Sequence, residues 1–521
     1  MKDEQQILPS FDFLSQQNRI RDFFSFDIKE FERLLRQKDE SFWSRMGEQR
    51  ALKLFHMAAK RVPAYKHFLR MHRVNPDRIK TIRDFAHVPI TDKKNYIQQY
   101  PLADRSWDGT LRNQKIAAIS SGTTGEPTFW LRGDFQEFEQ GIVHELLYRY
   151  LFDIEKYRTL LVIGFPMGIY VSGVATAFPS FLVATKGYPL TIASVGNSKN
   201  QILRTVKHLQ KDYEQIILAG HPFFIKDVIE AGRTAGIMWS RKKMRVMFCS
   251  EEFSEHWRSY VAECTGIKQD LKSLINVYGS SDLLLIGYET PISIFCRMLA
   301  EDNPLFRRRL FDEEAATAPQ LFQYNPLLRH IEAENGELLF TSASGIPLIR
   351  FNIHDAGKVM PYRDIADALD EALAGWKQKL HNQSNGAPVW RLPFVVLRGR
   401  NDQTVIFYAV NIYPDHIRIA LDHDPFFGKI TGKFTLRKCN TKRMDAYLEV
   451  HIELRGGIKQ NAGLVERIRN HLVRRLKEVN IEYADASARL DKDLRPRVRL
   501  WPYQHPKYFR PGTKPRYIAK E

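Results

Sequence analysis

The sequence predicts an α/β protein with a large N-terminal domain and a small C-terminal domain. Between residues 159 and 290, apolar runs alternate with stretches of helical periodicity, which is typical of a sheet with helical crossovers. Beyond residue 330 the pattern changes to short strands of alternating polarity. The remainder indicates β, α, β, β, α and a basic tail, which is the size of a small separate α+β domain. We place the two domains at residues 1–400 and 401–521.

The composition is that of a globular intracellular protein. The chain has 521 residues, 44% of them hydrophobic, which suffices for a core and for more than one domain. Its four cysteines lack paired spacing, so neither a disulfide framework nor a zinc ribbon is predicted. The N-terminus carries early acidic residues and no apolar stretch, unlike a signal peptide. We therefore expect a reducing compartment, the cytoplasm.

The net charge of +18 suits anionic partners, among them nucleotides, CoA, RNA or an acidic membrane surface. Basic residues are dense near the C-terminus, as at Arg495, Arg497 and Arg499. They lack the interleaved aromatic residues of an RNA-binding motif. A solvated basic face is the preferred interpretation, and no specific nucleic-acid partner is predicted.

The first 150 residues indicate helices and one hairpin. Residues 1–60 carry apolar side chains at helical spacing. The apolar runs Ile116–Ile119 and Phe129–Leu131 predict two strands on either side of a polar turn. The segment Phe135–Tyr150 then predicts an amphipathic helix with Asp134 placed to cap it.

Seven further elements follow before residue 290. The candidate strands are Thr159–Phe165, Gln215–Ala219, Arg245–Cys249 and Leu274–Val277, and the candidate helices are Gln201–Lys211, Pro222–Ala231 and Ser254–Cys264. Ligands of such sheets gather at the carboxyl ends of the strands. The loops that follow these strands are therefore candidate site segments, and they span residues 165–168, 220–222, 250–252 and 278–282.

Residues 159–185 carry no charge and are long enough to span a bilayer. Two prolines, Pro166 and Pro179, and three glycines interrupt this run. A buried strand, a glycine-rich turn and a core helix therefore fit better than a transmembrane helix. We predict no transmembrane segment.

An insertion is predicted at about residues 361–390. The segment Ile365–Leu380 indicates one amphipathic helix, and Asn382–Gly386 indicates a polar loop. The sequence does not indicate what this insertion does.

The predicted hairpin turn, Ser120–Thr128, contains two glycines and five hydroxyl residues. Glycine lets the backbone turn sharply and bring its N–H groups close to an anion. Hydroxyl groups add donors for phosphate oxygens. This composition favours a phosphate-cradling loop over an ordinary polar turn. It is not a Walker A loop, which needs Gly-Lys-Ser/Thr after a spacer.

Five stretches, in this order and spacing, resemble the adenylate-forming superfamily of acyl-CoA synthetases and peptide-synthetase adenylation domains. They are Ser120–Thr128, Tyr278–Asp282, Pro347–Asp355, Gly399–Asp402 with Val410–Pro414, and Pro511–Tyr517. The phenylacetate–CoA ligase-like branch is the most similar, and Val62–Lys93 resembles it too, so the resemblance covers nearly the whole chain. It implies a large domain of stacked sheets with helices and a small β-subdomain, and a mobile C-terminal lid.

The resemblance implies ATP, Mg²⁺ and CoA as cofactors. The implied phosphate-binding residues are Ser120, Ser121, Gly122, Thr123, Thr124 and Gly125. The implied nucleotide-binding residues are Tyr278, Gly279, Ser280 and Ser281, the last facing the α-phosphate. Asp355 would accept hydrogen bonds from the ribose hydroxyls, and Arg400 would bind the ribose or the phosphates. Asp282 stands where the family carries Glu and is the candidate Mg²⁺ ligand.

Lys514 would reach the α-phosphate and the carboxylate oxygens and stabilise the charge that grows in the transition state. With Thr124 and Arg400 it forms the implied catalytic set. Asp402 stands at the family's hinge position, about which the small domain rotates between half-reactions. The acyl pocket is expected near Phe165, Tyr170, His221 and Pro222.

Three positions depart from the family pattern. Glu126 replaces the lysine common in the phosphate loop, and a carboxylate beside phosphates is unfavourable unless it points away. Asp282 is one methylene shorter than Glu. Ala409 replaces a glycine at which the backbone approaches the thiolation tunnel, so its Cβ is expected to obstruct pantetheine or to demand strain. The last change bears on CoA transfer more than on adenylation.

The leading hypothesis is an acid–thiol ligase that adenylates a carboxylic acid and transfers the acyl group to CoA. An aromatic or apolar acid is the expected substrate. The alternative is an adenylating enzyme whose acceptor is a carrier protein, an amine or a sugar, which Ala409 favours. A third is a degenerate nucleotide-binding protein, which Glu126 and Asp282 favour and Asp355, Arg400 and Lys514 oppose. The sequence leaves open whether the chain forms a homodimer.

Overall fold

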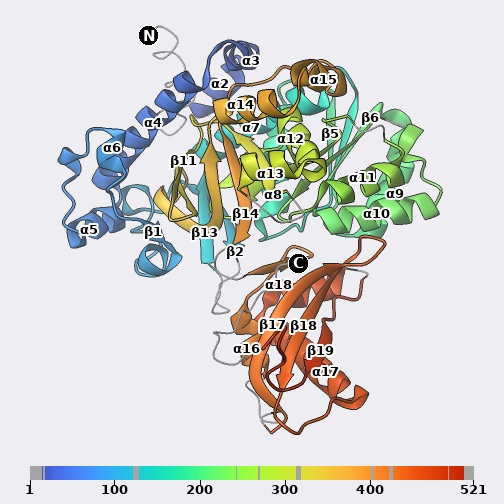
Figure 1. Ribbon diagram of the computed structural model, residues 1–521. Helices are drawn as coiled ribbons and strands as arrows, with labels where there is room; N and C mark the ends of the chain where they lie inside the picture. The colour runs from blue at the N-terminus through green and yellow to red at the C-terminus, as the bar shows by residue number, and fades with distance from the viewer. Residues whose placement is uncertain are drawn as a thin grey trace.

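The computed structural model describes residues 15, 18–120, 128–241, 243–267, 270–312, 318–400, 404–421, 426, 428–490 and 492–509. Two bodies are visible: a large one formed by residues up to 400, and a small one below it in Figure 1, formed by residues from about 414 onward. The predicted α/β class is confirmed.

One mixed sheet of twelve strands lies at the centre of the large body. Its order is β11-β12-β13-β14-β10-β9-β8-β7-β6-β4-β5, and β1 pairs with β13. From β5 to β8 in this order, neighbouring strands pair in parallel. From β8 to β11, on the other side, neighbouring strands pair antiparallel. The bounds are β1 Thr91–Asp92, β4 Thr159–Ile163, β5 Leu190–Ser194, β6 Gln215–Gly220, β7 Lys243–Cys249, β8 Leu274–Ser280, β9 Leu284–Tyr288, β10 Gln320–Tyr324, β11 His330–Glu334, β12 Glu337–Ser342, β13 Leu348–Met360 and β14 Phe394–Arg400.

Strand β13 is 13 residues long and joins the two parts of this sheet. Its first half pairs with β1 and β12, and its second half pairs with β14. We expected separate sheets that stack, but the two parts form one continuous sheet joined by β13. Motifs that lie far apart in the sequence meet along it.

The period of two in the buried strands places alternate side chains on the two faces of the sheet. In β4, Leu161 and Ile163 join one hydrophobic cluster, whereas Leu160 and Val162 join a second. The first cluster includes side chains of α7 (Asp134–Phe152), α8 (Val171–Ala184), α12 (Pro291–Asp302) and α13 (Pro304–Phe311). The second includes α9 (Lys199–Leu209), α10 (Pro222–Thr234) and α11 (Glu255–Thr265), and it continues into the small body.

The predicted crossover elements agree with this sheet to within a few residues. The largest differences are in α9, which begins and ends two residues before the predicted Gln201–Lys211, and in β8 and α10, which extend three residues further. Helix boundaries commonly shift by this amount because end turns fray. All four cysteines are free thiols, as expected.

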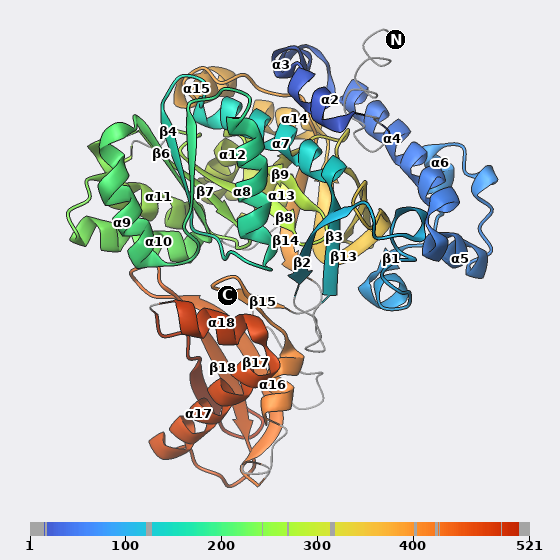
Figure 2. The same cartoon turned by 180° about the vertical axis from the view of Figure 1, so that it is seen from behind.

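Helices of the N-terminal segment lie along one side of the large body (Figure 2). The helical prediction for this segment is confirmed over its described residues. The helices are α2 Arg19–Ser25, α3 Ile28–Gln37, α4 Glu40–Arg61, α5 Pro63–Met71 and α6 Ile82–Phe85, with short turns η1 Pro76–Arg78, η2 Lys93–Ile97 and η3 Trp107–Gly109. Asp27 and Asp39 cap α3 and α4 by accepting backbone N–H bonds.

The predicted hairpin is present. Strands β2 (Gln114–Ser120) and β3 (Thr128–Gly133) pair antiparallel, with Ser120 opposite Thr128. Residues 121–127, which carry most of the hydroxyl-rich turn, lie outside the described residues. The hairpin leads directly into α7.

Helix α7 differs from its prediction. It was expected to be amphipathic, but every residue except Asp134 and Arg149 is buried, because the sheet and neighbouring helices enclose it. Its N-cap is Gly133, and Asp134 is the first helical residue, so the predicted cap at Asp134 is wrong. The Asp134 carboxylate instead accepts from the next backbone N–H and from Arg19.

The uncharged run 159–185 folds as β4, a turn and α8, as expected. Pro179 lies inside α8. Among the described residues, no helix is long and apolar enough to cross a membrane.

The insertion near residues 361–390 forms two helices rather than one. They are α14 (Tyr362–Ala372) and α15 (Trp376–Gln383). Gly375 separates them with a φ of 71°, a backbone conformation that favours glycine. Buried Ile365, Leu369 and Trp376 fix the pair on the core of the large body.

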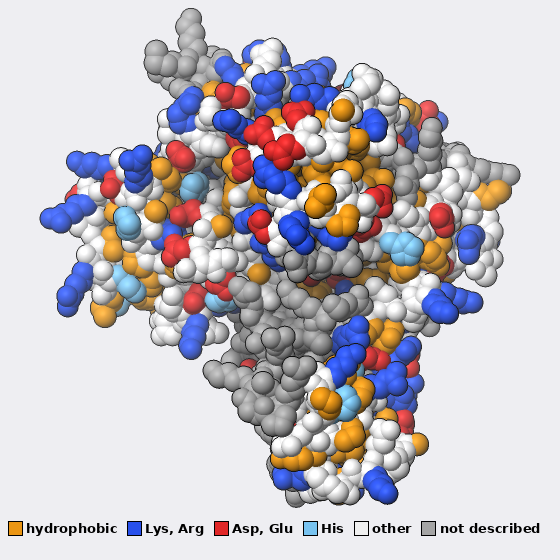
Figure 3. Space-filling model, viewed as in Figure 1, with side chains coloured by type: hydrophobic (Ala, Val, Ile, Leu, Met, Phe, Trp, Pro, Cys, Tyr) orange, Lys and Arg blue, Asp and Glu red, His pale blue; other side chains and the backbone are white. Residues whose placement is uncertain are grey.

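The small body carries more structure than predicted. Its three-stranded sheet consists of β17 (Ile430–Asn440), β18 (Ala446–Leu454) and β19 (Arg497–Trp501), with helices α16 (Pro414–Leu421), α17 (Ala462–Val479) and α18 (Ile481–Arg489). A hairpin of β15 (Val405–Phe407) and β16 (Val410–Ile412) leads into it. The part of the basic tail around Arg497 and Arg499 is thus β19, parallel to β18. Basic side chains are spread over both bodies among acidic ones (Figure 3).

Candidate active site

A cavity of about 320 Å³ lies where the carboxyl ends of the parallel strands face the small body. Its wall combines residues from the predicted loops, the β13–β14 pair and the β15–β16 hairpin. The predicted site residues that line it are Ser120, Phe165, Tyr170, His221, Tyr278, Gly279, Ser280, Ser281, Asp282, Asp355 and Arg400. The structure thus brings together residues more than 250 positions apart in the chain.

Some predicted residues lie elsewhere. Pro222 is the first residue of α10 and is buried there, so it does not form part of the cavity wall. Proline suits this position because the first helical N–H has no partner in any case. The predicted residues Ser121, Gly122, Thr123, Thr124, Gly125, Asp402 and Lys514 lie outside the described residues.

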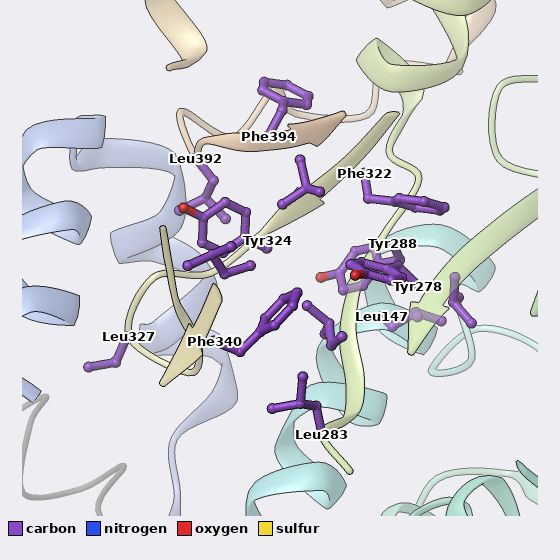
Figure 4. Packing of buried hydrophobic residues seen from close by; sticks show 14 of the residues in the cluster. Leu147, Tyr278, Leu283, Tyr288, Phe322, Tyr324, Leu327, Phe340, Leu392 and Phe394 are labelled. Atoms are coloured by element: carbon purple, nitrogen blue, oxygen red, sulfur yellow. The ribbon is translucent and has the colours of Figure 1, made fainter. Parts of the chain in front are cut away.

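One wall presents a tyrosine, a carboxylate and a guanidinium. The Tyr278 hydroxyl donates to Asp355 Oδ2 at 2.5 Å, and Arg400 Nη1 lies 3.7 Å from Asp355 Oδ1. Asp355 is opposite Arg400 in the β13–β14 register, which explains their proximity. The Tyr278 ring stacks on Phe322 within the packed cluster of Figure 4. Burial, with the Asp355 carboxylate beside it, raises the pKa of Tyr278 well above its usual value.

Asn276 is a cavity residue that the sequence analysis missed. It precedes Tyr278 by two residues on β8 and so lies on the same face of the strand. Its Nδ2 donates to Glu251 O and Gln320 Oε1, while its buried Oδ1 accepts no bond from the described protein. A buried acceptor of this kind requires a donor.

Close packing between β8 and β9 requires glycine at position 279. A Cβ there would lie 2.8 Å from the carbonyl oxygen of Leu284 on the neighbouring strand. The chain can therefore turn from β8 into β9 and present Ser280 to Asp282 to the cavity only with glycine at this point.

The phosphate side of the cavity carries a lysine that was also missed. Lys93 Nζ donates to Ser120 Oγ at 3.2 Å and lies 5.8 Å from the centre of the Trp130 ring. Trp130 Nε1 donates to the same Ser120 oxygen. These contacts fix the last residue of β2, from which the hydroxyl-rich turn departs. Only the segment Val62–Lys93 as a whole had been singled out in the sequence.

Asp282 is 7% exposed and lines the cavity, and among the described residues no cation or donor pairs with its carboxylate. Its carboxylate oxygens are not enclosed by protein, so they are open to a cation in the cavity. Oxygen ligands from one or two carboxylates are the usual protein contribution to a Mg²⁺ site. The residue present therefore fits the metal role implied for it.

Two aromatic residues and two histidines form the opposite wall. Phe165 meets His221 edge to face with ring centres 5.1 Å apart. Tyr170 lies at the start of α8, and burial with the carboxylates of α18 raises its pKa to about 12. His144, from the middle of α7, also lines the cavity and was missed, because a histidine inside a buried helix has no sequence signal of function.

The hairpin that leads into the small body closes the cavity with Tyr408 and Ala409, at the turn between β15 and β16. The Ala409 N–H donates to Glu251 Oε1 at 2.9 Å, and the Tyr408 hydroxyl donates to Asp227 at 3.2 Å. Both residues have left-handed backbone, with φ of 50° at Tyr408 and 60° at Ala409. The strain expected from alanine at 409 is therefore present.

Other strained residues border the cavity. Ser250 and Leu284 line it with φ of 77° and 59°, and His354, with φ of 63°, precedes Asp355. Non-glycine residues in this region store energy and persist where the surrounding structure fixes them, most often at functional sites. Their grouping supports this cavity as the active site.

Comparisons with known proteins agree with this geometry. No protein-family model matches the chain. The phenylacetate–coenzyme A ligase of Aromatoleum evansii is 21% identical over 404 residues, which is 76% of this chain and 78% of that protein. The one from Thermus thermophilus is 22% identical over 390 residues, or 72% and 74% of the two chains.

Solved structures show the same fold. A crystal structure of 2-hydroxyisobutyryl-CoA ligase with 2-HIB-AMP and CoA in the thioesterification state covers 94% of this chain and 91% of its own, with a TM-score of 0.63 and 15% identity. The chain is therefore similar, as predicted, to the phenylacetate–CoA ligase-like branch of the adenylate-forming superfamily. These relatives are acid–CoA ligases, the class of enzyme that the sequence motifs predict.

The arrangement of the two bodies can also be compared. The same 2-hydroxyisobutyryl-CoA ligase in its post-adenylation state covers 94% of this chain at 15% identity, but its TM-score is 0.51. The fold of this chain therefore superposes better on the thioesterification structure.

Proposed function

We propose that the protein activates a carboxylic acid with ATP, forms an acyl adenylate with release of pyrophosphate, and transfers the acyl group to CoA. The observation that carries the proposal is the convergence of Tyr278, Asp355 and Arg400 with the phosphate-loop hairpin on one cavity. The similarity to phenylacetate–CoA ligases supports the same reaction.

The nucleotide would lie along the wall formed by β8, β13 and β14. Asp355 would accept hydrogen bonds from ribose hydroxyls, and Arg400 would contact ribose or phosphate oxygens. Lys93 and the loop after Ser120 would bind the phosphates. Such reactions are catalysed by positioning and charge neutralisation, which these groups supply.

Asp282 would hold Mg²⁺, which neutralises phosphate charge when bound. Lys514 would stabilise the α-phosphate charge during adenylation. We propose the domain boundary at residues 400 and 401 and the hinge at Asp402. The better superposition on a thioesterification structure supports the described arrangement as that of the second half-reaction.

The acid would occupy the wall formed by Phe165, Tyr170 and His221, together with His144. Aromatic side chains there are compatible with an aryl acid. We propose an aromatic or apolar acyl group as the class of substrate.

Ala409 favours a second candidate for the acceptor of the acyl group. Its Cβ lies where the family has glycine, beside the approach to the reacting centre, so a carrier protein, an amine or a sugar is the alternative to CoA.

One experiment separates these functions. The protein is incubated with ATP, Mg²⁺ and a panel of carboxylic acids, with and without CoA, and acyl-AMP and acyl-CoA are measured by mass spectrometry. Acyl-CoA formation with some acid supports the proposed function. Acyl-AMP without thioester supports the alternative acceptor. ATP binding without either product contradicts both.

A further inference from the structure

Two buried histidines of the acyl wall have the same hydrogen-bonding arrangement. His144, on α7, is 3% exposed, and His221, after β6, is 5% exposed. His144 Nδ1 lies 2.8 Å from the carbonyl oxygen of Gln140, and His221 Nδ1 lies 3.2 Å from that of Cys249. A carbonyl oxygen only accepts, so Nδ1 carries the proton in both rings.

The second nitrogen of each ring is then an acceptor. Burial lowers the pKa of His144 to about 4 and lowers that of His221, so both rings are neutral near pH 7. In a neutral ring with the proton on Nδ1, Nε2 offers a lone pair. No group in the described part of the chain hydrogen-bonds either Nε2, and neither atom is enclosed by protein. Both residues line the cavity, so both acceptors are open to it.

The surroundings of His144 are neutral. The cavity residues contributed by α8 and the start of β9 are Val171, Ser172, Ala175, Thr176, Leu284 and Leu285. The Thr176 hydroxyl donates its proton to Ser172 O and therefore offers the cavity only acceptor capacity. None of these residues is a carboxylate, so an ammonium group would find no counter-charge among them.

A buried acceptor left without a donor is costly, so a ligand that supplies one is preferred. A site built to bond a hydroxyl discriminates strongly against the analogue that lacks it. We propose that the acid substrate carries a hydroxyl group, in addition to its carboxyl, that donates to one of these two acceptors, His144 Nε2 in preference to His221 Nε2. This proposal rests on the function proposed above and deepens it by naming the substrate class.

The test is direct binding, measured by isothermal titration calorimetry without ATP. Phenylacetate is compared with 2-, 3- and 4-hydroxyphenylacetate, and butyrate with 3-hydroxybutyrate. In the wild type at least one hydroxylated acid should bind about tenfold or more tightly than its parent. In His144→Leu this ratio should fall to near one, and His144→Gln should retain part of it, since its amide oxygen still accepts. His221→Leu should reduce the ratio by a smaller factor.

The affinity for the parent acid and the unfolding midpoint report whether each variant is folded. If a leucine variant fails to fold, the affinity ratios of the wild type and of His144→Gln still test the proposal. The proposal is overturned if no hydroxylated acid binds more tightly than its parent, or if the ratio survives in both leucine variants. Binding is independent of turnover, so a hydroxyl preference without adenylation would contradict the proposed function and leave this assignment supported.

Discussion

Lys438 of the small body donates to Glu251 of the large body at 2.6 Å. The Glu251 side chain is fully buried, and its other oxygen accepts the Ala409 N–H. The Lys438 ammonium also lies 4.4 Å from the centre of the Phe223 ring. One buried carboxylate therefore fixes both the β17 strand and the turn that closes the active site.

A second group of charges spans the same junction. Lys226 pairs with Asp445 at 2.8 Å, and Lys492 pairs with Asp227 at 2.8 Å and with Asp445 at 3.1 Å. The three carboxylates of Asp227, Glu230 and Asp445 are close enough to suggest a metal site. The two ammonium groups already compensate them, so they are better explained as contacts between the bodies.

Lys438→Met should slow thioester formation and spare adenylation. The pair exists in the described arrangement, and its removal leaves a buried carboxylate without its cation, which destabilises that arrangement. We expect acyl transfer to fall at least about tenfold and acid-dependent pyrophosphate exchange to change less than about twofold. Lys433→Met is the control, since Lys433 is on the same strand and pairs with Glu453 inside the small body. Equal losses in both half-reactions would contradict this account.

Ala409→Gly should stabilise the protein and favour acyl transfer to CoA. Alanine at a φ of 60° carries roughly 1 kcal/mol of strain that glycine lacks. The midpoint of urea unfolding should rise, and the rate of thioester formation should rise with it. Ala446→Gly, in ordinary strand geometry in β18, should instead destabilise by about 0.5–1 kcal/mol. A lower stability for Ala409→Gly would show that the left-handed backbone is not under strain.

Asp355→Asn should weaken ATP binding. A carboxylate that accepts hydrogen bonds from neutral hydroxyls is replaced by a weaker acceptor, so we expect the KM for ATP to rise about tenfold or more. Asp367→Asn, on the exposed face of α14, is the control and should leave it unchanged. The KM for ATP is measured by steady-state kinetics with the carboxylic acid substrate at saturation. An unaltered KM in Asp355→Asn would show that the ribose binds elsewhere.

His144 should make the folded protein sensitive to acid. Its pKa is lowered to about 4 by burial, against about 6.5 in the unfolded chain, so the folded state binds fewer protons between these values. Its stabilising contribution is complete above pH 6.5 and is lost as pH falls toward 4, reaching a loss of about 2 kcal/mol at pH 5. When urea unfolding is measured at pH 7 and at pH 5, the free energy of unfolding should fall by about 2 kcal/mol less in His144→Gln than in the wild type. Parallel losses in the two proteins would mean that His144 titrates normally.

Much of the fold was predictable because local patterns and global structure agree. The strand β4 is buried along its whole length and carries four consecutive apolar residues, because helices cover both faces of the sheet. The hairpin before α7 was found from its apolar runs alone. Helix α7 was misjudged because its polar residues, including Glu139, are buried in ion pairs with Arg50 and Arg329 that only tertiary structure brings near.

The site was predictable where residues cluster in motifs. Tyr278, Asp355 and Arg400 lie in three such motifs, and the β13–β14 register brings the last two together. Asn276 could have been found by strand alternation, two residues before Tyr278. Lys93 and Glu251 lie in segments that the sequence had singled out, Val62–Lys93 and the loop 250–252, but their contacts follow only from tertiary packing. His144 could not have been found, because it lies inside a buried helix.

The most direct test of the central claim is acid-dependent ATP–pyrophosphate exchange with the wild type, Lys514→Ala and Lys520→Ala, without CoA. Lys520 is a second lysine of the same tail and serves as the matched control. The account predicts exchange with at least one acid, a loss of at least about a hundredfold in Lys514→Ala, and wild-type exchange in Lys520→Ala. Exchange that persists in Lys514→Ala, or ATP binding without exchange for any acid, would contradict adenylation by this site.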